Sequence, residues 1–216
     1  MFELLKEAGK ILENMNVKWC FCGGWALDLF MKSETRPHKD LDIMVFKKDL
    51  KETISYLKDQ GWRLEVPTRK GFMPVDTENY ESFEYENLWC MNENYPVDYL
   101  KVDEQGSCTF YQYEREIQDK VDFMEILLNT YESKMFVYRR NTDIRLAIEK
   151  AIYEFEGLPY LAPEIVLLYK SKYLSEDNQS DFDTVYVKLD EAQKMWLKNA
   201  LTLEYGNDHP WVQALQ

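Results

Sequence analysis

The chain has 216 residues, of which 45% are hydrophobic and 15% aromatic, and this composition excludes an intrinsically disordered protein. Its length allows either one sizeable core or a larger and a smaller lobe. With 39 acidic and 26 basic side chains the net charge is -13, which repels phosphate backbones and disfavours nucleic acid as a partner.

The cysteines and the first residues bear on the cellular compartment. Cys20, Cys22, Cys90 and Cys108 lack the paired spacing of a zinc site, and a chain of this length needs no disulfide framework, so we expect reduced thiols in the core. The first fifteen residues, MFELLKEAGKILENM, intersperse charged with apolar side chains, unlike a signal peptide, and no long apolar run follows. We therefore expect a cytoplasmic protein that does not enter a membrane.

The first third of the chain alternates between helices and short strands. Apolar residues at helical spacing and β-rich runs predict helices over 2–15, 25–32 and 47–60 and strands over 17–22, 40–46 and 62–66. Gly23 and Gly24 separate the first strand from the second helix, and a polar loop, SETRPHK, precedes the second strand. Asp49 is the expected N-cap of the third helix, and Gly61 follows its end.

The remaining chain predicts more strands and then helices. The polar residues 67–82, with two prolines, predict a loop, and alternating residues then predict strands over 83–90, 96–102 and 108–114 and one ending near Phe155. The stretch 157–173 is expected to start a helix with Pro163 in its first turn, and a second helix is expected over 189–206, ending at Gly206. The chain thus predicts a sheet flanked by helices, followed by a small helical bundle.

Two aspartates stand one residue apart in the apolar run DLDIMVF. In a strand, residues two apart point to the same face, so Asp40 and Asp42 present their carboxylates side by side. Two charges at about 4 Å repel by about 4 kcal/mol at an effective dielectric of about 20, so the pair requires a cation, a shared proton or full hydration. Mg²⁺, which prefers oxygen ligands, is one solution, and a solvated strand end is the other.

The glycine pair adds a second signal at a defined spacing. A strand, then Gly23 and Gly24, then a helix start lets backbone amides approach a polyphosphate where the helix dipole favours negative charge. The motifs CGGWALDLF, TRPHKDLDIMV, GLPYLAPEIVLLYKSK and HPW together resemble the nucleotidyltransferase superfamily, in the branch that contains the aminoglycoside and lincosamide adenylyltransferases. The resemblance covers nearly the whole chain. It implies an α+β fold: a mixed sheet of the nucleotidyltransferase type in residues 1–158 and a small helical lobe in residues 159–216.

The resemblance also implies a third carboxylate on a later strand, which completes a magnesium site and acts as the base on the acceptor hydroxyl. Asp98 is the preferred candidate because PVDYLKV alternates and places Asp98 and Leu100 on one face of a strand. Asp76, in a polar loop, is the alternative. The predicted metal ligands are therefore Asp40, Asp42 and Asp98.

The predicted nucleotide-binding residues are Gly23, Gly24, Arg36 and Lys170. Arg36 lies in the loop before the two aspartates, where it either meets the triphosphate or remains a solvated surface charge. Lys170, from LLYKSK, is the preferred cation from the helical lobe, with Lys172 as the alternative.

The function implied by the resemblance is transfer of AMP from ATP to a hydroxyl of a small molecule, with Mg²⁺ as cofactor and pyrophosphate as the second product. An acidic chain suits a cationic acceptor such as an aminoglycoside. Two alternatives stay open: a nucleotidyltransferase of the toxin–antitoxin type that modifies a protein or RNA, and a nucleotide-binding sensor without catalysis.

Overall fold

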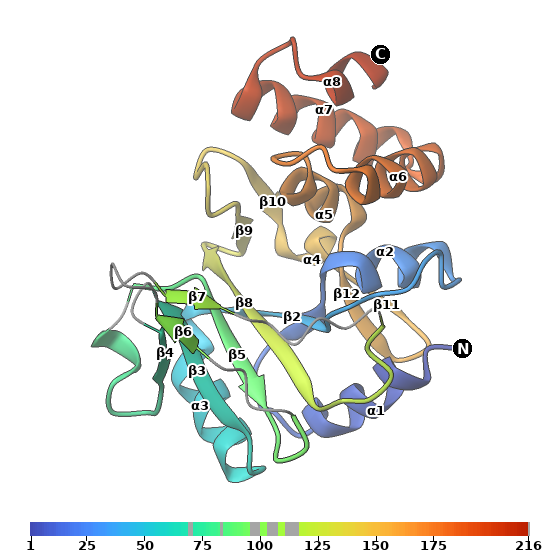
Figure 1. Ribbon diagram of the computed structural model, residues 1–216. Helices are drawn as coiled ribbons and strands as arrows, with labels where there is room; N and C mark the ends of the chain where they lie inside the picture. Colours follow the sequence, from blue (N-terminus) through green and yellow to red (C-terminus); the bar gives the residue numbers. More distant parts are fainter. Residues whose placement is uncertain (69–70, 83, 96–99, 103–107, 111–116, 216) are drawn as a thin grey trace. The chain divides into compact units, whose positions relative to one another are not determined.

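The computed structural model of the protein describes residues 1–68, 71–82, 84–95, 100–102, 108–110 and 117–215 (Figure 1). The chain forms two compact units. Unit 1 consists of Met1, Cys20–Thr35 and Asn129–Gln216, and unit 2 consists of Phe2–Trp19 and Arg36–Leu128. Each unit is therefore assembled from segments that are far apart in the sequence.

Unit 2 contains a sheet with the strand order β2-β8-β5-β3-β4. The strands are β2 (Asp42–Phe46), the first part of β8 (Phe123–Glu132), β5 (Asn87–Met91), β3 (Arg63–Thr68) and β4 (Gly71–Pro74). From β8 to β4, each strand is antiparallel to the next. A separate antiparallel pair is formed by β6 (Leu100–Val102) and β7 (Cys108–Phe110).

Two helices of unit 2, α1 (Glu3–Leu12) and α3 (Leu50–Asp59), lie next to each other. The Tyr56 hydroxyl donates to the Ile11 carbonyl at 2.6 Å, and α3 contacts β2 and β3. The buried side chains recur at helical spacing in both helices: Leu5, Ala8 and Leu12 in α1, and Leu50, Thr53, Ile54 and Leu57 in α3. The periodicity of the sequence thus gives the face that each helix buries. The short 3-10 helices η1 (Lys47–Asp49) and η2 (Tyr80–Ser82) complete the unit.

Unit 1 contains two groups of strands. In the first, β12 (Leu158–Leu161) pairs parallel with β1 (Trp19–Phe21) and antiparallel with β11 (Ile152–Phe155). In the second, β9 (Met135–Val137) pairs with the end of β8 and with β10 (Arg145–Ala147). Parallel and antiparallel pairs therefore occur together.

The helices of unit 1 pack around α5 (Pro163–Lys170), which contacts α2, α6 and α7. The others are α2 (Gly23–Met31), α4 (Ile148–Ala151), α6 (Glu176–Val185), η3 (Tyr186–Lys188), α7 (Glu191–Tyr205) and α8 (Pro210–Ala214). Six consecutive residues of α5, from Pro163 to Leu168, are buried. A helix that is buried on most sides is expected at the centre of a bundle, and Glu164 is the one acid among these six residues.

The predicted α+β fold with a mixed sheet flanked by helices is confirmed, and the elements described from Pro163 to Leu215 are all helical. Two local predictions were wrong in part. Residues 67–82 were expected to form only a loop, but β3 extends to Thr68 and β4 pairs with it. Within residues 157–173 the helix begins at Pro163, so the prediction of this residue in the first turn is confirmed, but Leu158–Leu161 before it form β12, because Glu156 (φ 52°) and Gly157 (φ 79°) turn the chain between β11 and β12. Positive φ at both central residues is typical of a two-residue hairpin turn. The boundary between residues 158 and 159 stays a prediction.

The structure also bears on the cysteines and on membrane spans. Cys20, Cys22 and Cys90 are buried free thiols, and burial raises the pKa of the Cys20 and Cys90 thiols above the usual range. Among the described residues, no helix combines the length and the apolar character needed to cross a membrane.

Candidate metal and nucleotide site

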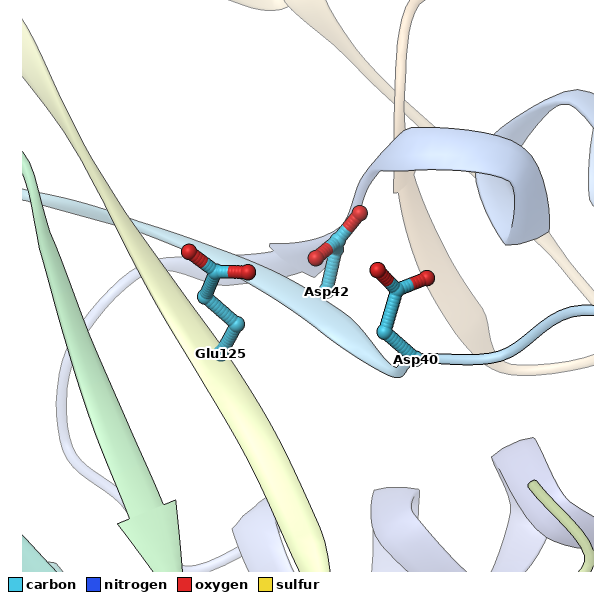
Figure 2. A group of neighbouring side chains, drawn as sticks. All are labelled: Asp40, Asp42 and Glu125. Carbon is cyan, nitrogen blue, oxygen red and sulfur yellow. The ribbon is translucent and has the colours of Figure 1, made fainter. Parts of the chain in front are cut away.

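Three carboxylates meet in unit 2. Ligand atoms of Asp40, Asp42 and Glu125 all lie within 4.8 Å of one another, and all three side chains are half-buried. Figure 2 shows the three side chains converging: Glu125 extends from β8, Asp42 from the first position of β2, and Asp40 from the residues just before that strand. The predicted side-by-side arrangement of the two aspartates is confirmed.

Backbone hydrogen bonds explain why these residues meet. The Glu125 amide donates to the carbonyl of Leu41, the residue between the two aspartates, at 2.9 Å. Gln118, just before β8, donates its own amide to the His38 carbonyl at 2.8 Å. The buried Gln118 side-chain amide bonds the Phe123 carbonyl at 2.8 Å. The segment that carries the aspartates is therefore held by one hydrogen bond to β8 and by another to the residues before that strand.

Glu125 lies between an apolar cluster and a polar neighbour. Trp89 of β5 is directly opposite Glu125 in the strand pair, and its ring meets Phe123 edge-on with centroids 5.4 Å apart. On the other side, Asn87 Nδ2 donates a hydrogen bond to Glu125 Oε1. The carboxylate thus accepts a hydrogen bond from a neutral donor, and Glu125 has Trp89 as its partner in the strand pair.

The donor set fits a hard divalent cation. Three carboxylate residues supply oxygen ligands, which Mg²⁺ and Mn²⁺ prefer over nitrogen or sulfur, and all three side chains are only partly buried. Three like charges within 4.8 Å also repel one another, and a cation removes that repulsion. Asp40, Asp42 and Glu125 are therefore the residues that would hold the metal.

The two predicted candidates for the third carboxylate differ from Glu125. Asp98 lies outside the described residues, so its role stays a prediction. Asp76 is at the start of a turn, where its carboxylate accepts hydrogen bonds from the amides of Glu78 (2.8 Å) and Asn79 (3.0 Å). These bonds hold the pKa of Asp76 below its ordinary value. Asp76 is not part of the three-carboxylate group.

Glu125 was not predicted, because no element was assigned to the residues around it. A signal was present: Glu125 is a single acid in the apolar run FMEILL, as Asp42 is in DLDIMVF. An ionised side chain inside a strand that is otherwise buried requires a partner or a function.

The glycine pair begins a helix in unit 1. Gly23 and Gly24 are the first two residues of α2, and Gly23 has φ 60°. Only glycine adopts this left-handed conformation without strain. At the other end of α2, the buried Asp28 accepts hydrogen bonds from the Thr35 amide at 3.0 Å and from the Thr35 hydroxyl. The predicted strand, glycine pair and helix are present, and phosphate binding by the glycines stays a prediction.

The structure gives hydrogen-bond partners for the two predicted nucleotide-binding cations, Arg36 and Lys170. Arg36 donates to the carbonyl of Pro37 at 3.1 Å. The ammonium of Lys170 lies 2.8 Å from a carboxylate oxygen of Asp181 and 3.1 Å from Oδ1 of Asn178, within the helices of unit 1. This ion pair gives Lys170 a structural role, while nucleotide binding by Arg36 and Lys170 stays a prediction.

Comparison with known proteins begins with the family model for aminoglycoside-2''-adenylyltransferase, which matches residues 4–138 of this chain. A curated relative, a lincosamide resistance protein of Staphylococcus haemolyticus, is 30% identical over 70 residues, or 32% of this chain. The matched part spans only 44% of that relative's length.

Two solved structures share the fold. The solution structure of the antibiotic-resistance factor ANT(2'')-Ia is 12% identical, with a TM-score of 0.54 over 94% of this chain and 91% of that one. The crystal structure of the lincosamide antibiotic adenylyltransferase LnuA is 16% identical, with a TM-score of 0.54 over 86% of this chain and 96% of that one. At these identities the likeness concerns the fold. Because the family model matches more than half of the residues, the chain belongs to the aminoglycoside-2''-adenylyltransferase family.

Proposed function

We propose that the protein is a metal-dependent nucleotidyltransferase that transfers AMP from ATP to a hydroxyl group of a small, cationic, antibiotic-like acceptor. The observation that carries the proposal is the convergence of Asp40, Asp42 and Glu125 in a chain of this family. A bound divalent cation would supply charge neutralisation at the nucleotide phosphates.

In the proposed reaction the acceptor oxygen forms a bond to the α-phosphorus of ATP, and the bond from that phosphorus to the bridging oxygen breaks, so that pyrophosphate leaves. Asp40, Asp42 and Glu125 would hold the cation, and a carboxylate would accept the proton of the acceptor hydroxyl. Asp98 remains the predicted base for this step, and Glu125 is a second candidate because it belongs to the cluster. Transfer of this kind depends mainly on positioning and on charge.

The acceptor is proposed from charge and from the relatives. A net charge of -13 attracts cations to the surface. The family model carries the name of an aminoglycoside-modifying enzyme, and LnuA was solved with lincomycin bound. Aminoglycosides and lincosamides both offer hydroxyl groups beside amines, and they are the two acceptor classes that we propose.

The test is an incubation of the protein with each nucleoside triphosphate, Mg²⁺ and a panel of aminoglycosides, lincosamides and neutral sugars. Pyrophosphate release and the mass of the acceptor are measured. We expect one acceptor to gain the mass of a nucleoside monophosphate, with no gain for the Asp42→Asn variant. Bound nucleotide without any product across the panel would contradict transfer to a small molecule and favour a sensor or a macromolecular acceptor.

A further inference from the structure

We propose that Asn87 is a positioning residue of the metal site, because its side-chain amide holds Glu125 in the conformation that faces Asp40 and Asp42. The inference rests on the proposed function, since it requires that the three carboxylates bind a cation. It goes further by assigning a role to a residue that supplies no metal ligand itself.

The strand register places Asn87 for this role. Asn87 is opposite Leu127 in the β5–β8 pair, so it is the diagonal neighbour of Glu125 on the same face of the sheet. Its Nδ2 atom donates to Glu125 Oε1. The residue directly opposite Glu125 is Trp89, whose apolar ring packs on Phe123. On β5, Asn87 is therefore the polar neighbour of Glu125 and Trp89 is the apolar one.

A glutamate in this place needs a restraint. Its side chain has several rotatable bonds, and ordering such a side chain costs conformational entropy. In addition, Asp40 and Asp42 repel its carboxylate when no cation is bound. A hydrogen bond from a neighbour opposes both effects, because it favours one rotamer before the cation arrives.

A neutral amide is better suited than a charged donor to hold Glu125 in this conformation. Lys or Arg at position 87 would pair with Glu125 and compete with the cation for its carboxylate. The neutral amide of Asn87 donates one hydrogen bond and leaves the negative charge of the cluster intact. The same logic applies to residues that orient metal ligands in other proteins, whose loss weakens metal affinity by about 10- to 100-fold.

The chain offers a matched control at the other end of the same strand pair. Asn92, just after β5, uses its Nδ2 atom to donate to the Val121 carbonyl at 3.0 Å. This bond also comes from a side-chain amide, but it joins the residues that flank the two strands, and Asn92 Oδ1 in addition accepts from the Asn94 amide at 2.8 Å. Its acceptor is a backbone carbonyl and not one of the three carboxylates. A purely structural role for Asn87 predicts that the Asn87→Ala and Asn92→Ala variants behave alike.

The experiment measures binding of Mn²⁺ alone, by electron paramagnetic resonance, to the full-length protein and its variants, with the melting temperature recorded for each. We expect Asn87→Ala to weaken Mn²⁺ binding by about 10-fold. Asn92→Ala should bind Mn²⁺ like the wild type, and Asn87→Gln, which keeps the donor, should bind more tightly than Asn87→Ala. In the Glu125→Gln background, Asn87→Ala should cause no further loss, because it acts through Glu125.

The outcomes separate the inference from the proposed function. If the wild type binds Mn²⁺ and Asp42→Asn does not, but Asn87→Ala binds like the wild type, the positioning role is overturned and the metal site stands. Equal losses in Asn87→Ala and Asn92→Ala would also overturn it. If the wild type binds Mn²⁺ no better than Asp42→Asn does, the metal site itself fails, and the proposed function fails with it.

Discussion

Asp42 is the first residue of a strand whose next four residues are all buried, and its carboxylate lies beside those of Asp40 and Glu125. We expect Asp42→Asn to abolish metal binding and nucleotidyl transfer, and to raise the melting temperature of the metal-free protein, because one repulsive charge is removed. Calorimetry with and without Mg²⁺ and a pyrophosphate assay measure both effects. A variant with near-normal turnover would contradict the metal site.

The third metal ligand is either Glu125 or Asp98, and the two assignments predict different effects of substitution. Loss of a residue that only orients a metal ligand weakens metal binding by about 10- to 100-fold. We expect Glu125→Gln, which removes a ligand itself, to weaken binding of Mn²⁺ alone by more than this. If Asp98 acts only as the base, Asp98→Asn should lower the turnover number and leave Mn²⁺ affinity unchanged. The reverse pattern would assign the third ligand to Asp98.

The three carboxylates also show which part of the site could be predicted from the sequence. Asp40 and Asp42 could be paired from the sequence because residues two apart in an extended segment point to the same side, which is a local property, although β2 itself begins only at Asp42. Glu125 could not be joined to them in this way, since a local pattern gives the face of a side chain but not which strands become neighbours. The Glu125 amide and the Leu41 carbonyl make that connection only in the folded sheet.

At the scale of elements, the start of α2 carries a backbone prediction. Gly23 has φ 60°, and Gly24, the next residue of the helix, does not have a positive φ. We expect Gly23→Ala to destabilise the protein by about 1–2 kcal/mol, because an L-residue is strained in the left-handed region. Gly24→Ala lacks this strain. Urea denaturation of both variants measures the difference, and equal stabilities would contradict the assigned backbone conformation.

An ion pair between α5 and α6 gives a second prediction about the secondary-structure elements. Lys170 and Asp181 form an ion pair with side chains only 15% and 5% exposed. We expect Lys170→Met to cost about 3–5 kcal/mol, because the charge of Asp181 is left buried without its partner. The double variant Lys170→Met, Asp181→Leu should regain most of that stability. If Lys170 instead serves the nucleotide, the double variant will be stable but will have a raised KM for ATP.

The hairpin of β11 and β12 shows a limit of periodicity. In EGLPYLAPEI, the apolar residues fit a helix as well as a strand, and the helical interpretation extended the helix too far toward the N-terminus. The decisive features were Gly157 in the turn and Pro163 at the first helical position. Turn chemistry therefore locates this boundary better than apolar spacing does.

For the molecule as a whole, stability depends on pH through a buried acid. Glu164 of α5 is 2% exposed, and burial raises its pKa from the ordinary 4.5 to about 7. It accepts a hydrogen bond from Gln193 Nε2 at 2.9 Å. The charge of Asp190 also raises the pKa, and Tyr153 and Tyr160 are the other titratable groups beside it. The folded state therefore prefers protonated Glu164.

The sign of the pH effect follows from this preference. The pKa of Glu164 is higher in the folded than in the unfolded protein. Protonated Glu164 therefore contributes fully to the free energy of unfolding below about pH 4.5, and this contribution is lost as the pH rises through about 7. We expect Glu164→Gln, which keeps the bond from Gln193, to be more stable than the wild type at pH 8 by about 3 kcal/mol. Near pH 4.5 the two should be similar. Denaturation curves across this range measure the difference, and parallel profiles would contradict it.

The net charge of -13 gives a further prediction for the whole protein. If the acceptor is cationic, its KM should rise several-fold between about 0.05 M and about 0.5 M salt, because screening weakens long-range attraction. A neutral sugar acceptor that is turned over should show no such rise. Steady-state kinetics at several salt concentrations make the comparison, and a flat profile for a cationic acceptor would argue against electrostatic attraction.

The hydrogen bond from the Glu125 amide to the Leu41 carbonyl has a consequence for folding. Side chains alternate along β8, so a shift of one residue between β8 and β2 would turn Glu125 toward the face that buries Met124 and Ile126. A misaligned sheet would then contain a buried acid and lack the cluster of three carboxylates. If the cluster binds a divalent cation as proposed, that binding is also a test of strand alignment, and a refolded sample that binds Mn²⁺ like the native protein has paired these strands correctly.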